Sequence, residues 1–142
     1  MESGKAMLQI FIVEDHPIMR QSLRKLLERE ADLAVCGEVA TAETALEQID
    51  LEEPDLVLID VSLPGMSGIE LTRILRDRHP DLPLAILSGH RERSYVIQAL
   101  KAGAHGYILK GNARELPAAI RQIMSGERYL SHAISGLGAG RG

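Results

Sequence analysis

The chain has few of the features that mark several large protein classes. It carries one cysteine, Cys36, in 142 residues, so no disulfide can form within the chain. Cys36 follows an apolar stretch, and we interpret it as a core thiol because no activating base is evident beside it. No apolar run reaches membrane-spanning length, and no signal-peptide pattern opens the chain. These absences favour a cytoplasmic protein with no membrane contact.

An excess of positive charge is also missing. Sixteen basic residues face twenty acidic ones, and the formal net charge is −4. Nucleic-acid binders usually carry a basic patch, so the charge argues against nucleic-acid binding by this chain itself. Its longest basic cluster, residues 73–80, is interrupted by Asp77 and is interpreted as a solvated helix face.

What is present is an ordinary globular composition with a regular pattern. Apolar residues make up 45% of the chain and charged residues 25%, which is typical of a single soluble domain. Five short apolar runs alternate with five amphipathic segments. The predicted strands are residues 8–14, 33–39, 55–60, 83–88 and 106–110.

The segments between these runs carry apolar residues at helical spacing. Thr41 is the expected N-cap of the second helix, and Asn112 with Glu115 is expected to form a capping box for the fifth. Near-continuous apolar strands are typical of parallel sheets covered on both faces. The pattern predicts an α/β fold: a flavodoxin-like (βα)5, doubly wound, parallel five-stranded sheet in the order 2-1-3-4-5.

The pattern also predicts the domain organisation. Residues 1–7 lack periodicity and are expected to be a flexible leader, while residues 8–126 hold the domain. Residues 127–142 lose the pattern and are expected to be a linker or tail, too short for a second domain.

Charged or hydroxyl-bearing residues close four of the five predicted strands. Glu14 and Asp15 end the first strand, Asp60 the third, Ser88 the fourth and Lys110 the fifth. Ligands of open parallel sheets bind at the carboxyl ends of the strands. The three carboxylates should therefore share one cleft, where they repel one another unless a cation lies among them. Oxygen ligands of this kind suit Mg²⁺.

At these residues the sequence resembles a receiver domain of bacterial two-component response regulators. The resemblance covers residues 8–126 and rests on "VEDHP", "LIDVSLPGMSG", "ILSGH" and "GAHGYILKG". The "EDHP" and "LKG" variants look most like the NarL/FixJ subfamily, whose members carry LuxR-type output domains. Gly111 follows Lys110 where many other receivers have proline, which removes a restrained peptide bond.

The resemblance implies a role for each residue of the set. Asp60 would be the phosphorylated residue, with Ser88 and Lys110 completing the catalytic group. Asp15, Asp60 and the Ser62 carbonyl would bind Mg²⁺ directly, and Glu14 would act on it through water. Ser88 and Tyr107 would form the switch that reports phosphorylation. His90 and Ser62, each two residues beyond a site residue, would border the phosphoryl group.

The resemblance also implies partners. A sensor histidine kinase would donate the phosphoryl group, and phosphorylation would favour a homodimer. The chain would not be an enzyme beyond self-catalysed phosphoryl acceptance and slow autodephosphorylation. The subfamily usually carries a C-terminal DNA-binding domain that controls transcription. We expect that output domain to be absent from this chain, either cut away or never present in a stand-alone receiver.

Other functions stay open at this point. A flavin or nucleotide binder could share the fold, although "EDHP" would repel a phosphate and no GxGxxG or GxxxxGK[ST] motif occurs. A phosphatase with an aspartyl nucleophile should carry a second acid where Ser62 stands. An inactive receiver would act only as a protein-interaction module.

Overall fold

A computed structural model describes residues 7–131. The leader expected over residues 1–7 therefore lies almost wholly outside the described residues, as does most of the expected linker. Within this range one sheet of six parallel strands has the order β2-β1-β3-β4-β5-β6. The strands are β1 (Leu8–Val13), β2 (Leu33–Val39), β3 (Leu56–Asp60), β4 (Leu84–Ser88), β5 (Gly106–Leu109) and β6 (Tyr129–Leu130).

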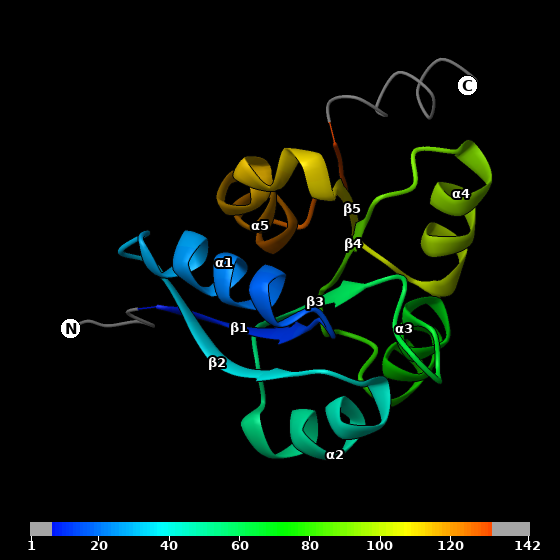
Figure 1. The fold of residues 1–142 in the computed structure, drawn as a ribbon, viewed down its shortest axis with the longest axis horizontal. Coiled ribbons are helices and arrows are strands. Elements are labelled where there is room, and N and C mark those ends of the chain that lie inside the picture. Colours follow the sequence, from blue (N-terminus) through cyan, green and yellow to red (C-terminus); the bar gives the residue numbers. More distant parts are fainter. Residues whose placement is uncertain (1–6, 132–142) are drawn as a thin grey trace.

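Helices cover both faces of the sheet (Figure 1). They are α1 (Pro17–Glu28), α2 (Ala42–Glu52), α3 (Gly68–Arg78), α4 (Arg93–Ala102) and α5 (Leu116–Met124), with a 3₁₀ turn, η1 (Lys110–Glu115), before α5. Helices α1 and α5 pack on one face and share a core with Ile10, Ile12 and Leu58. Helices α2, α3 and α4 pack on the other, around Phe11 and Tyr107. The predicted doubly wound fold and the order of its five strands are confirmed.

A sixth strand extends the predicted sheet. Tyr129 and Leu130 pair in parallel with Gly106 and Tyr107 of β5. Both residues lie in the segment that the sequence predicts to be a linker or tail. The sheet therefore continues into that segment, and β5 is an inner strand instead of an edge.

Local signals explain where the helices begin and end. The Thr41 hydroxyl accepts a hydrogen bond from the Thr44 amide at 3.1 Å, which confirms the predicted N-cap of α2. Gly103 ends α4 with a φ of 114°, a conformation that suits glycine. The predicted capping box of Asn112 and Glu115 is wrong, because η1 occupies these residues and Glu115 precedes α5 without a side-chain cap.

Candidate functional site

The sheet register brings the predicted site residues to one edge. Val13 pairs with Ile59, so Glu14 follows β1 beside Asp60, the last residue of β3. Asp60 pairs with Leu87, which places Ser88 one residue further along β4. Ser88 in turn pairs with Leu109, and Lys110 comes next. Parallel pairing thus gathers residues that are up to 96 positions apart in sequence, from 14 to 110, at the carboxyl ends of the strands.

An acidic cluster is the centre of this edge. Glu14, Asp15 and Asp60 each offer a carboxylate oxygen, and these oxygens lie within 4.8 Å of one another. Glu14 is 1% exposed and Asp60 2% exposed, while Asp15 is half-buried. Carboxylates this close, shielded from water, repel one another strongly. The convergence predicted from the sequence is confirmed for all three.

The Glu14 carboxylate is the group whose ionisation this arrangement disfavours most clearly. Its Oε2 accepts a hydrogen bond from the His16 amide at 3.1 Å. Its Oε1 is buried and has no hydrogen-bond partner among the described residues. Burial raises the pKa of Glu14 to about 7, and the negative charge of Asp60 adds to the rise, while the His16 hydrogen bond and Lys110 oppose it.

Lys110 supplies a positive charge to the same cluster. Its Nζ donates a hydrogen bond to Oδ2 of Asp60 at 3.2 Å and lies 3.8 Å from Oε1 of Glu14. The other oxygen of Asp60, Oδ1, accepts from the Ser62 amide at 3.1 Å. One ammonium group facing three carboxylates leaves a net negative site.

The donor set fits a hard divalent cation. All three side chains offer oxygen, and one buried carboxylate oxygen lacks any hydrogen-bond partner within the described range. Mg²⁺ prefers carboxylate oxygens and keeps several waters, which the half-buried Asp15 side of the cluster would admit. The residues present therefore fit the magnesium ion expected from the sequence.

The loop after Asp60 ends at Gly68, which packs against the main chain of Asp60 and Val61. The Gly68 amide donates to the Val61 carbonyl at 3.1 Å and closes the loop. A Cβ added to Gly68 would lie 2.2 Å from the main-chain oxygen of Asp60. Gly65 has a φ of 72°, which favours glycine. Both glycines are thus required for the path of the loop beside Asp60.

Ser88 and Tyr107 are linked through the main chain of His90. The Ser88 hydroxyl oxygen accepts from the His90 amide at 2.9 Å. The Tyr107 hydroxyl donates to the His90 carbonyl at 2.7 Å. Both side chains are fully buried, and burial raises the pKa of Tyr107. Sequence reasoning missed this junction, because main-chain atoms of any residue could form it.

The His90 side chain points to another neighbour. Its ring stacks on Tyr95 of α4 with centroids 4.1 Å apart and an interplanar angle of 11°. Both rings, with Ser62 of the loop after β3, help line a hollow of about 410 Å³ between that loop, α3 and α4. His90 therefore borders the predicted site without belonging to the acidic cluster.

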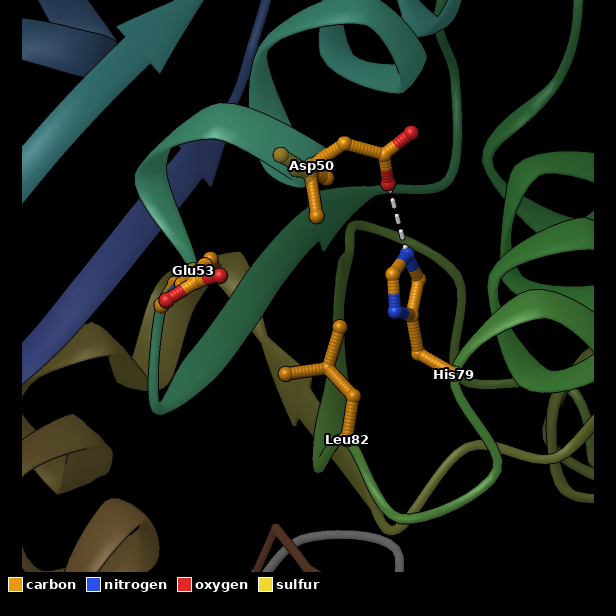
Figure 2. Close-up of a pocket in the computed structure, with 6 residues that line it drawn as sticks. Asp50, Glu53, His79 and Leu82 are labelled. Atoms are coloured by element: carbon orange, nitrogen blue, oxygen red, sulfur yellow. Dashed lines mark hydrogen bonds and ion pairs between the residues drawn. The ribbon is translucent and has the colours of Figure 1, made fainter.

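A second pocket lies at the opposite end of the sheet (Figure 2). Its volume is about 320 Å³, and it lies between the end of α2 and the segment before β4. His79 and Asp50 approach there at 2.8 Å between Nε2 and Oδ1, with Leu82 beside them. None of the predicted site residues lines this pocket.

No helix within residues 7–131 is both long and apolar enough to cross a membrane.

Comparisons with known proteins agree with the geometry. The family model of the response regulator receiver domain matches residues 10–121. The chain is 36% identical to the transcriptional regulatory protein DegU of Brevibacillus brevis, over 87% of the chain and 52% of that protein. It is 35% identical to the response regulator UvrY of Escherichia coli (strain K12), over 91% of the chain and 60% of that protein. The chain thus spans between half and two-thirds of the length of these relatives.

A solved structure extends the likeness to the fold. A two-component response regulator of the LuxR family from Aurantimonas sp. superposes with a TM-score of 0.88 at 37% sequence identity. The match covers 91% of this chain and 93% of that one. The chain therefore belongs to the family of response regulator receiver domains, within the NarL/FixJ subfamily of two-component regulators.

Proposed function

We propose that the chain is a phosphorylation switch whose phosphoacceptor is Asp60. One observation carries the proposal: Asp60 ends the central strand with one oxygen beside the Lys110 ammonium, inside the acidic cluster. A carboxylate is a poor nucleophile toward phosphorus because both partners carry negative charge. The site residues therefore have to position the donor and balance its charge.

Each residue of the site has a proposed task. Asp15, Asp60 and the Ser62 carbonyl would hold Mg²⁺, with Glu14 acting through water. The ion would supply positive charge that offsets the phosphoryl oxygens. An Asp60 oxygen would form the new P–O bond as the P–N bond of a phosphohistidine breaks and the leaving imidazole takes up a proton. Lys110 would stay paired with the transferred group.

Ser88 and Tyr107 would report the transfer. The Ser88 oxygen already accepts from the His90 amide, so its hydroxyl proton is available to a phosphoryl oxygen. Movement of Ser88 toward that oxygen would change the His90 main chain, to which Tyr107 is bonded. Reorientation of Tyr107 on activation stays a prediction. The buried position described above would be one end point of that movement.

The proposed partners follow from the family. The phosphoryl donor would be a sensor histidine kinase, and the phosphorylated form would dimerise. Relatives named as a transcriptional regulatory protein and a response regulator are longer than this chain, which supports a DNA-binding output domain in the full-length protein. The receiver itself would be cytoplasmic and would bind no nucleic acid. It would not be an enzyme beyond self-catalysed phosphoryl acceptance and slow autodephosphorylation.

Intact mass spectrometry after incubation with acetyl phosphate and Mg²⁺ tests the proposal. We expect one phosphoryl adduct on the wild type, none on Asp60→Asn and none with excess EDTA. Asp77→Asn makes the same chemical change on the exposed face of α3 and should leave the adduct unchanged. A wild type without adduct, or an equal adduct on Asp60→Asn, would contradict the proposal and favour an inactive receiver or a phosphate-independent binding module.

A further inference from the structure

Residues 129–131 form a clasp along β5, the strand that leads to Lys110. We call these three residues the β5 clasp. Three hydrogen bonds join the clasp to the strand and to His105, the residue before it: Tyr129 N–H to the His105 carbonyl at 3.0 Å, Ser131 N–H to the Tyr107 carbonyl at 2.9 Å, and Leu109 N–H to the Ser131 Oγ at 2.8 Å. The clasp thus satisfies main-chain groups of β5 that would otherwise face solvent.

Ser131 makes the contact nearest to the site. Its side chain is fully buried, although the residue stands in a segment whose sequence is typical of a linker. Its hydroxyl oxygen accepts from the amide of Leu109, the residue directly before Lys110. A buried amide that loses its acceptor is costly, so this bond restrains the main chain where it enters the site.

Beyond β5 the main chain continues as the short 3₁₀ turn η1, which begins at Lys110. Gly111 follows it, and a Cβ built there would meet no atom within 4 Å. Glycine is the most permissive residue, so Gly111 itself adds little restraint to Lys110. The Lys110 side chain is held at its tip, where Nζ meets Asp60. Besides its pairing with β4 and the turn η1, the main chain directly before Lys110 is therefore held by the Ser131 hydroxyl.

The clasp also holds the far end of the turn that begins with Lys110. The Tyr129 hydroxyl donates to Oε1 of Glu115 at 2.7 Å, and Glu115 is the last residue of η1. The turn of residues 110–115 is thus bonded to the clasp at both ends, through Leu109 before it and Glu115 within it.

We propose that the β5 clasp sets the position of Lys110, and that Ser131 is a positioning residue for phosphoryl transfer to Asp60. This inference rests on the proposed function. It gives the segment after α5 a role in the chemistry, since loss of one hydroxyl there would move an ammonium group that contacts the phosphoacceptor.

A double-mutant cycle separates positioning from mere support of the fold. The rate of adduct formation with acetyl phosphate and Mg²⁺ is measured for wild type, Ser131→Ala, Lys110→Ala and the double variant, each shown to be folded by circular dichroism. We expect Ser131→Ala to slow the wild type about tenfold, because the lysine is displaced. In the Lys110→Ala background the same change should cost less than about twofold.

Two further variants complete the experiment. Ser125→Ala removes an exposed hydroxyl at the end of α5 and should react at the wild-type rate. Ser131→Cys keeps the side-chain shape with a weaker acceptor, so it should show an intermediate rate and serves if Ser131→Ala does not fold.

The outcomes are distinct. Equal slowing by Ser131→Ala in both backgrounds would assign Ser131 a structural role only, and an unchanged rate in folded Ser131→Ala or Ser131→Cys would also overturn the inference. A wild type that takes up no phosphoryl group would instead overturn the proposed function, and the positioning role with it. A reactive wild type with an insensitive Ser131 would leave the proposed function intact.

Discussion

Replacing Glu14 with glutamine should stabilise the protein at high pH and leave its stability nearly unchanged at low pH. The Glu14 carboxylate is buried, lies near Asp60 and has one oxygen without a hydrogen-bond partner in the described part of the chain. Its ionised form is therefore disfavoured in the folded state. Glutamine has nearly the same shape, carries no charge, and its amide can donate to the Asp60 carboxylate.

The structure sets the size and the sign of the effect. The pKa of Glu14 rises from 4.5 to about 7 on folding. Because a pKa change of one corresponds to roughly 1.4 kcal/mol, ionised Glu14 lowers the free energy of unfolding by at most about 3 kcal/mol. Between these pH values the folded state binds more protons than the unfolded state. The free energy of unfolding of the wild type therefore falls as pH rises through this window.

Urea unfolding followed by circular dichroism, from pH 5 to pH 8 in EDTA, measures this difference. We expect the stability advantage of Glu14→Gln over the wild type to be under about 1 kcal/mol at pH 5, just above the unfolded pKa of 4.5, and to grow to at most about 3 kcal/mol at pH 8. Added Mg²⁺ should stabilise the wild type at pH 8 and narrow the gap. A variant that is less stable than the wild type at pH 8, or a gap that does not depend on pH, would refute this reasoning.

Three further predictions concern the surroundings of the site. Gly68→Ala should lower the free energy of unfolding by about 1–3 kcal/mol, because the new methyl group meets the Asp60 main chain; an unchanged urea midpoint would contradict this. His90→Ala should shorten the lifetime of the phosphorylated form by opening the site to water, and equal lifetimes by intact mass would end the hypothesis. Burial raises the pKa of the Cys36 thiol, so a disulfide reagent at pH 8 should label native protein about tenfold more slowly than protein in urea; similar rates would show an accessible thiol.

The sequence predicted the parts of the fold that follow from long patterns. Apolar runs located five strands to within a residue at each end; the first, for instance, ends at Val13 where residue 14 was expected. The N-cap at Thr41 was predicted because a hydroxyl bonded to an amide three residues later is a local contact. The capping box at Asn112 was wrong because Asn112, with a φ of −115°, lies inside a 3₁₀ turn.

The same distinction applies to the site: contacts that follow from strand patterns could be predicted, and those made by a short segment or by main-chain groups could not. The meeting of Glu14, Asp15, Asp60 and Lys110 could be predicted, because the carboxyl ends of parallel strands share one edge. The β5 clasp could not be predicted, since its strand β6 has only two residues, too few to show a period, and it pairs only with β5. The His90 junction uses amide and carbonyl groups, which every residue type other than proline possesses.

The two outer strands of the sheet limit how copies of the chain can associate. At one border, β2 carries an irregularity, where its register with β1 shifts between Ile10 and Phe11 and leaves Cys36 unmatched. At the other, β6 has only two residues. Short or bulged outer strands are poor templates for further strand pairing. Self-association of this domain should therefore proceed through helix surfaces. Addition of strands from further copies to the sheet, which would lead to polymers, should be disfavoured.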